Sequence, residues 1–275
     1  MNPITSCDLV LKEINSVKSA SRNFVTNYYL NKDSLEFWLR RKCFFFDKIG
    51  ETSFFYRKDQ DFFHLFYISP AYEELGRSLG VLAGRDEILV ADIVAKPGEI
   101  DSILSVFFKN SFHPYITLQR MYKTTAMGRE KYEFHNEITY AFKGDEETIH
   151  DILISGVDRY AEQIPSVEEL TLEIRNKNII LIKKEGVIAG FVHYNIKGLT
   201  SHLRYWFVNP DFREQRIGSK LLRSYFSLTP QAIRFILWVI QTNDNAIKRY
   251  FHYGYVLDNL TDTVLINKEN MNYGK

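Results

Sequence analysis

The sequence has few cysteines and almost no net charge. Its two cysteines, Cys7 and Cys43, belong to no CxxC pair or Cys/His cluster, which argues against a disulfide scaffold and a metal site. The formal net charge of +1 provides no broad basic field, so we expect no nucleic-acid partner. No run approaches the ~18 consecutive apolar residues of a membrane span. Residues 1–11 lack the basic leader and apolar run of a secretory signal. We therefore expect a cytoplasmic protein without a membrane partner.

Length and composition predict two domains. The chain has 275 residues, of which 45% are hydrophobic and 25% charged, as in soluble proteins with a substantial core. No low-complexity segment or Pro/Gly-rich linker divides it. The polar stretch 124–131 is the best candidate boundary, so we expect domains at 1–130 and 131–275. Nothing in the sequence indicates the oligomeric state.

The second half alternates strand and helix patterns. Apolar residues at three- and four-residue spacing indicate helices, and short β-branched or aromatic runs indicate strands. Expected strands cover 138–142, 178–183, 187–196, 203–208, 234–240 and 263–267; expected helices cover 146–160, 166–174, 215–226 and 246–252. This order predicts an α/β layered domain.

The first half repeats part of this order. Expected strands cover 43–46, 53–57, 62–68, 87–95 and 115–122, with a helix at 99–108. Pro70 and Pro210 end comparable three-strand meanders. We interpret the halves as a tandem repeat with a degenerate first copy, although any two α/β domains could share such a string. A degenerate copy would have the same strand order and an empty cofactor groove.

The stretch 213–220, Arg-Glu-Gln-Arg-Ile-Gly-Ser-Lys, lies between an expected strand and an expected helix. Backbone N–H groups at a helix N-terminus form an anion site. Gly218 would let a phosphate approach the backbone, and Ser219 adds a hydroxyl donor. Positive charge comes from Arg213, Arg216 and Lys220. By itself, this pattern fits a basic surface turn equally well.

A second pattern follows the strand at 234–240. Asn243, Ala246, Tyr250, Gly254 and Tyr255 have the spacing N-x-x-A-x-x-x-Y-x-x-x-G-[FY]. Together with the preceding loop, which is similar to [RQ]-x-x-G-x-[GA], it resembles the GNAT superfamily of acetyl-CoA-dependent N-acyltransferases. The resemblance covers about half of the chain. It implies a mixed sheet flanked by helices and a coenzyme A site, but no particular acceptor.

The resemblance implies a role for each matching residue. The pyrophosphate of coenzyme A would lie against the loop, and Arg216 stands where the family usually has glycine. The backbone at the end of the preceding strand would pair with the pantetheine arm, and Asn243 would touch that arm. Tyr250 would protonate the departing thiolate, unless it is only a core tyrosine. The implied cofactor-binding residues are Phe207, Val208, Arg213, Arg216, Ile217, Gly218, Ser219, Lys220 and Asn243.

The implied reaction is direct attack of a neutral amine on the thioester carbonyl, which backbone N–H groups near Val208 would polarise. A base or a water relay must remove the amine proton. The family often uses a carboxylate on the strand before the loop, but no Asp or Glu occurs between Leu199 and Val208. His202 is the candidate base there, unless it is a surface strand histidine.

The first half lacks both patterns. Residues 71–77 are acidic where phosphates would bind, and 96–100 replace the second pattern. The leading hypothesis is therefore an N-acetyltransferase in the second half, acting on a primary amine of a small molecule or peptide. Alternatives are transfer of a longer acyl or aminoacyl group, and an acyl-CoA sensor without turnover.

Overall fold

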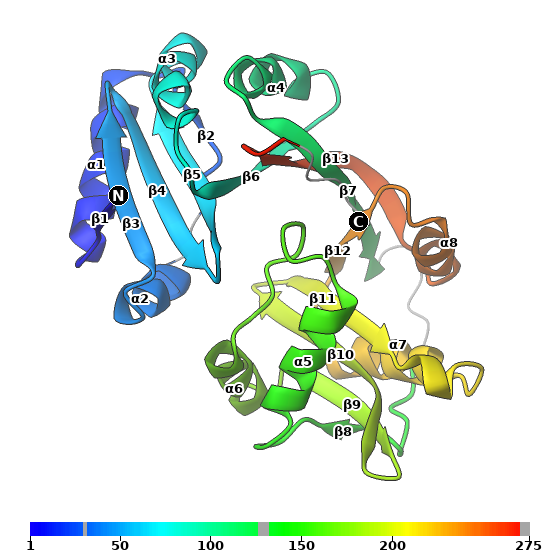
Figure 1. The fold of residues 1–275 in the computed structure, drawn as a ribbon. Helices are drawn as coiled ribbons and strands as arrows, with labels where there is room; N and C mark the ends of the chain where they lie inside the picture. The colour runs from blue at the N-terminus through cyan, green and yellow to red at the C-terminus, as the bar shows by residue number, and fades with distance from the viewer. Residues whose placement is uncertain (30–31, 126–131, 270–275) are drawn as a thin grey trace. The chain divides into compact units, whose positions relative to one another are not determined.

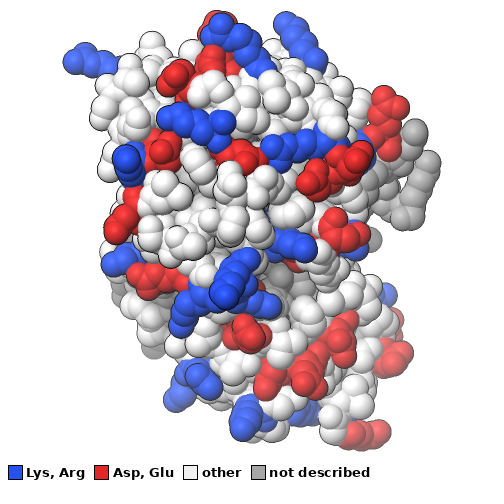
Figure 2. All heavy atoms as spheres, turned by 60° about the vertical axis from the view of Figure 1, so that its left-hand side comes forward, with Lys and Arg blue, Asp and Glu red and all other residues white. Residues whose placement is uncertain are grey.

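The computed structural model describes residues 1–29, 32–125 and 132–269 (Figure 1). The chain divides into two compact units of α/β structure. Unit 1 contains residues 1–118 and 259–275, and unit 2 contains residues 119–258. No helix among the described residues is long and apolar enough to cross a membrane. Figure 2 shows acidic and basic side chains interspersed over one face, as the small net charge implies.

Unit 2 is built around a mixed sheet with the strand order β12-β11-β10-β9-β8. Neighbouring strands are antiparallel except β11 and β12, which are parallel. Its main elements are β8 (Thr139–Tyr140), α5 (Glu146–Gly156), α6 (Val167–Arg175), β9 (Ile179–Lys184), β10 (Val187–Lys197), β11 (Thr200–Val208), η2 (Pro210–Phe212), α7 (Ile217–Leu228), β12 (Arg234–Ile240) and α8 (Asp244–His252).

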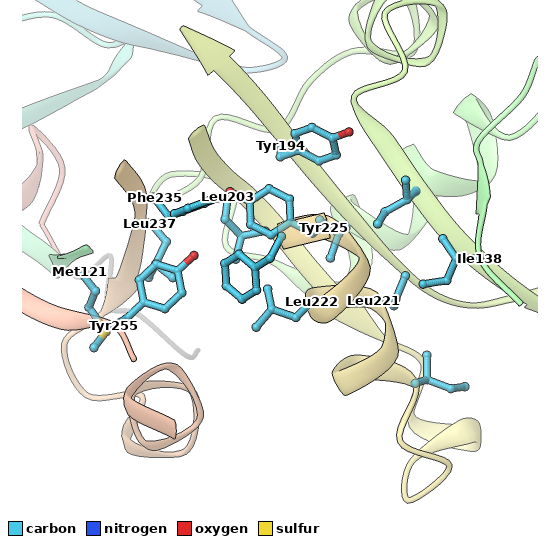
Figure 3. Close-up of a cluster of buried hydrophobic side chains, with 14 of the residues drawn as sticks. Met121, Ile138, Tyr194, Leu203, Leu221, Leu222, Tyr225, Phe235, Leu237 and Tyr255 are labelled. Carbon is cyan, nitrogen blue, oxygen red and sulfur yellow. The ribbon is translucent and has the colours of Figure 1, made fainter. Parts of the chain in front are cut away.

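Helices cover both faces of this sheet because successive apolar side chains along a strand point to opposite faces, so that both faces are apolar. On β9, Ile179 and Leu181 face α5 and α6, whereas Ile180 and Ile182 face α7. Figure 3 shows the α7 side, where the rings of Tyr194, Tyr225 and Phe235 pack beside aliphatic side chains. These two layers fix the positions of the loops at the strand ends.

Unit 1 has the strand order β1-β3-β4-β5-β6-β13, with β5 and β6 parallel. Its elements are β1 (Asn2–Pro3), α1 (Cys7–Ala20), β2 (Val25–Thr26), α2 (Lys32–Arg40), β3 (Phe44–Ile49), β4 (Thr52–Asp59), β5 (Phe62–Ser69), α3 (Tyr72–Leu82), β6 (Ile88–Ala95), α4 (Ile100–Phe108), residues 113–118 of β7 (His113–Thr124) and residues 259–266 of β13 (Val256–Ile266). Helices α1 and α2 cover one face of the sheet, and α3 and α4 cover the other.

The two units share one order of elements. In each, a three-strand antiparallel meander leads through a helix to a parallel strand, and a second helix follows. The parallel strands pair over three residues in both units. The last of these pairs are His64 with Val90 in unit 1 and His202 with Ile236 in unit 2. This agreement in register supports the interpretation of a repeated fold.

The division differs from the expected boundary at 130/131 in two respects, because unit 2 begins at Gln119 and the last strand returns to unit 1. From Asn259 onward, β13 pairs antiparallel with β6 and therefore belongs to unit 1. The sequence pattern indicated a strand there but could not indicate its partner. Residues 126–131 of the expected boundary lie outside the described residues. The expected elements also omitted α1, α2, α3, η2 and the two-residue strands β1 and β2.

Gly190 on β10 sets how closely α7 packs against the sheet. A Cβ atom there would lie 2.8 Å from the carbonyl oxygen of Phe207 and 2.9–3.0 Å from Ile217 and Leu221. We expect Gly190→Ala to lower the free energy of unfolding by about 1–3 kcal/mol through overpacking. Gly156→Ala is the control, because a Cβ atom there meets nothing within 4 Å. Denaturant titrations that found Gly190→Ala as stable as the Gly156→Ala control would contradict this account.

Candidate active site

The site begins where β11 and β12 separate. Their parallel pairing covers only Thr200–His202 on β11 and Arg234–Ile236 on β12. Beyond His202, β11 continues to pair with β10 on its other side, up to Val208. The edge of β11 that faces β12 is therefore left with backbone groups outside a ladder, and such groups need partners. An extended ligand could pair with this edge as an added strand.

A β-bulge lies in β11 at the point of separation. Leu203 pairs with Tyr194 and Tyr205 pairs with His193, so Arg204 is the extra residue. After the bulge, Tyr205 and Phe207 pack on the α5–α6 side, whereas Trp206 and Val208 pack on the α7 side. The bulge bends the strand away from β12 and orients its last residues.

The N-terminus of α7 provides backbone donors near this strand end. Arg216 is its N-cap residue and makes no side-chain capping hydrogen bond, and the first turn contains no acidic residue. Arg216 has φ +57° and ψ +19°, a left-handed conformation that favours glycine. The arginine thus adopts a backbone conformation that glycine adopts at no steric cost, at the position where the resemblance places glycine.

Some of the other loop residues pack against the core, and others are exposed to solvent. Ile217 is buried in the core, so only its backbone can face a ligand. A Cβ atom on Gly218 would lie 3.1–3.2 Å from Trp206 and Val208, so glycine lets α7 approach β11. The side chain of Arg213 is exposed, and Ser219 is half-buried.

Lys220 has an acidic partner within the chain. Its ammonium group forms an ion pair with Glu137, which Lys184 also contacts. These two hydrogen bonds lower the pKa of Glu137 to about 2. Glu137 thus balances part of the positive charge of Lys220 and Lys184, and no local sequence pattern indicated this contact because Glu137 lies 83 positions from Lys220.

Helix α8 carries Tyr250 toward β11. Its N-cap is Asn243, whose side-chain oxygen accepts a hydrogen bond from the N–H of Ala246 at 3.1 Å. The ring of Tyr250 lies 5.7 Å from that of Trp206 and 5.8 Å from that of Tyr255. Burial raises the pKa of the Tyr250 hydroxyl well above its usual value, and the negative charge of Glu162 raises it further. The hydroxyl is therefore protonated at neutral pH.

Two residues near Tyr250 were not among the site residues expected from the sequence. The indole N–H of Trp206 is buried and has no acceptor among the described residues, so it is an unused donor. Glu162 lies in the loop between α5 and α6, which β11 holds through a 3.0 Å hydrogen bond from the Tyr205 hydroxyl to the carbonyl of Gln163. No sequence motif marks either residue.

His202 lies at the closed end of the strand separation and is half-buried. Burial lowers its pKa to about 3, and the positive charge of Arg204 contributes to this shift. Its neighbour His193 is buried, with Nε2 3.5 Å from a carboxylate oxygen of Glu173. His202 is therefore neutral at pH 7, but such a low pKa makes it a weak base.

Residues 146–255 match the acetyltransferase (GNAT) family. This part of the chain is a GNAT domain. The match runs from α5 through α8 to Tyr255 and leaves out all of unit 1. Membership of the family indicates acyl transfer as the general chemistry of the GNAT domain. No curated protein matches the sequence.

Solved structures extend the similarity to both units. A tandem GNAT protein from the clavulanic acid biosynthesis pathway has a TM-score of 0.61 at 8% identity, covering 96% of this chain and 97% of its own. A Drosophila protein has a TM-score of 0.60 at 14% identity, with coverage of 96% and 97%. A GCN5-related N-acetyltransferase from Sphaerobacter thermophilus has a TM-score of 0.58 at 14% identity, with coverage of 78% and 76%. These similarities establish the fold, a mixed α/β arrangement with the tandem order expected from the sequence.

The left-handed conformation of Arg216 leads to a stability prediction. We expect Arg216→Gly to be more stable than Arg216→Ala by about 1 kcal/mol, because only a residue with Cβ is strained at this φ. The neighbouring Gln215 is the control, since it is not among the residues with positive φ. There the order should reverse, with Gln215→Ala more stable than Gln215→Gly. Unfolding curves of the four variants that showed the same order at both positions would refute the assigned loop conformation.

The lowered pKa of His202 predicts a pH dependence of stability. An unfolded histidine titrates near pH 6.5, whereas His202 in the fold titrates at about 3. Between these values the unfolded state binds more protons, so stability is fully present above about pH 6.5 and falls as the pH drops toward 3. We expect His202→Gln to lose less stability than the wild type between pH 7 and pH 5. The exposed His113 provides the control, His113→Gln. Equal losses in wild type and His202→Gln would count against the buried, neutral state.

Proposed function

We propose that the GNAT domain transfers an acetyl group from acetyl-CoA to a primary amine of a small molecule or peptide. The observation that carries the proposal is the open edge of β11 beside the uncapped N-terminus of α7. A strand edge suits the amide groups of a pantetheine arm, and a helix N-terminus suits a pyrophosphate. The two features are adjacent along the chain, as a single extended ligand requires.

The proposed cofactor contacts follow from the chemistry of each residue. The backbone of Phe207 and Val208 would pair with the pantetheine amides, and the N–H groups from Arg216 to Ser219 would bind the pyrophosphate. Arg213 and Arg216 would add charge from the solvent side, and Lys220, held by Glu137, would add charge at the first turn of α7. Asn243 would approach the arm from the end of β12. We add Trp206, because its buried N–H needs an acceptor that a bound ligand could supply.

Acetyl-CoA would supply the acyl group as a thioester. The backbone of β11 beyond the bulge would polarise the thioester carbonyl while the neutral amine attacks it. A C–N bond forms and the C–S bond breaks, and Tyr250 would donate its hydroxyl proton to the departing sulfur. The raised pKa of Tyr250 keeps that proton in place at neutral pH.

The amine must also lose a proton. His202 remains a proposed acceptor for it, although its low pKa limits its strength. Glu162 is a second candidate, since its negative charge acts on Tyr250 and its loop is held against β11. A carboxylate there would also attract a protonated amine before the proton is removed. The proposal therefore places the acceptor between the α5–α6 loop and the bulged strand.

The alternatives differ in what they require of this site. A longer acyl or aminoacyl group would use the same strand edge and the same Tyr250. An acyl-CoA sensor would need no proton donor, and the glycine-like conformation of Arg216 removes one reason to favour it.

Thiol release upon mixing the full chain with acetyl-CoA and a panel of primary amines tests the proposal. Release with at least one amine, but not without amine, is expected, whereas coenzyme A binding without release would favour the sensor.

The role of Tyr250 predicts a specific loss of rate. Tyr250→Phe keeps the ring that packs on Trp206 but removes the hydroxyl. We expect turnover to fall by roughly 10²–10⁴-fold, the usual scale of general acid–base catalysis, with little change in acetyl-CoA affinity. Tyr253→Phe is a matched control, because Tyr253 also packs on Trp206, at 5.8 Å. Near-normal turnover of Tyr250→Phe, with the chemical step shown to be rate-limiting, would leave water as the proton donor.

A further inference from the structure

The strand separation in unit 1 is not empty. There, β5 and β6 pair from Phe62 to His64 and from Ile88 to Val90 and then separate, as β11 and β12 do in unit 2. The short strand β2 lies along the separated part of β5. Its residues Val25 and Thr26 pair antiparallel with Ser69 and Ile68. A segment of the chain thus adds a strand where an extended ligand would do so in unit 2.

One side chain completes this arrangement across the gap. The Asn27 oxygen accepts a hydrogen bond from the N–H of Tyr67 at 2.8 Å. Its amide nitrogen donates to the carbonyl of Leu65 at 2.9 Å and to that of Asp92 at 3.3 Å. Leu65 and Tyr67 belong to β5 and Asp92 belongs to β6, so a single carboxamide supplies partners to the backbones of both strands. A pantetheine amide, with one N–H and one carbonyl, would offer the same types of group to a strand edge.

Further contacts hold the segment in place. The hydroxyl of Thr26 donates to the carbonyl of Tyr67 at 2.6 Å, and the hydroxyl of Ser21 donates to that of Pro70 at 2.8 Å. The ring of Tyr28 packs on Phe55, with ring centres 4.9 Å apart. The segment is therefore fixed at both ends and is integrated with the core of unit 1.

The helix that corresponds to α7 is also unsuited to phosphate. The first turn of α3 carries Glu73 and Glu74. Glu74 accepts a hydrogen bond from the N–H of Glu51 at 2.9 Å and pairs with Arg77 at 2.7 Å. Carboxylates at a helix N-terminus stabilise the helix but repel a pyrophosphate. The strand separation is thus occupied by the chain itself, and the helix terminus carries charge that opposes a pyrophosphate.

We infer that residues 25–27 take the place of the cofactor in unit 1, so that the chain binds one coenzyme A, in unit 2. The second statement rests on the proposed function, whereas the first does not. The groove that the repeat led us to expect as empty is filled, because the strand edges exposed by the separation need hydrogen-bond partners and Asn27 provides them. Unit 1 keeps the GNAT-like fold with an internal substitute for its ligand.

Hydrogen exchange on the full chain, without cofactor, tests the first statement. In the wild type the Tyr67 amide should be protected by its bond to Asn27. Asn27→Ala should speed exchange of this amide by at least about tenfold, because its acceptor is lost. Asn23→Ala, at an exposed position in the same segment, is the control and should leave it unchanged. Rapid exchange at Tyr67 in the wild type, or no change in Asn27→Ala, would overturn the inference.

Titration calorimetry with coenzyme A tests the number of sites. We expect one equivalent per wild-type chain, and loss of binding in Gly218→Val, whose new side chain would displace α7 from β11. Two equivalents in the wild type, or one undiminished equivalent in folded Gly218→Val, would show that unit 1 is open and overturn the inference. Absence of any binding in the wild type would contradict the proposed function alone, and the exchange experiment would then decide the role of Asn27.

Discussion

The site depends on how early two parallel strands stop pairing. Strands β11 and β12 share only three residue pairs, and the bulge at Arg204 turns β11 away immediately afterwards. Had the ladder continued, the backbone at the end of β11 would be satisfied within the sheet and could bind nothing. The close packing of Gly190 and Gly218 then brings α7 against the same strand, so helix donors and strand edge meet in one place.

The same separation occurs in unit 1 and is resolved differently. There the side chain of Asn27 hydrogen-bonds the edges of both strands, and the first turn of α3 carries carboxylates. In unit 1 an internal residue thus binds the backbone groups of the separated strands, whereas in unit 2 these groups are open to a ligand. Retention of the separated strands in a unit that lacks the phosphate loop suggests that the geometry belongs to the fold itself rather than to ligand binding.

Much of unit 2 could be predicted from the sequence because its signals are local. The apolar runs of β9 and β10, the Ser166 capping box and the helical spacing before Tyr250 each specify one element. The sequence marked Arg216 as an arginine at a usual glycine position, but its left-handed backbone emerged only in the structure. Helix α1 was missed although Ser6 caps it, because the aromatic runs of unit 1 indicate strands more clearly than residues 7–20 indicate a helix. The pairing of Lys220 with Glu137, the unused Trp206 donor and the place of Glu162 arise from tertiary packing, which no local pattern encodes.

Strand β13 has a consequence for how this chain is synthesised. It begins in unit 2 but pairs with β6 of unit 1, and the Leu89 N–H bonds to Asn267 across 178 positions. On the ribosome, β6 emerges long before this partner and presents an open edge, which favours misplaced pairing. Unit 1 is translated first but is completed after unit 2, when residues 259–266 have left the exit tunnel and can pair with β6.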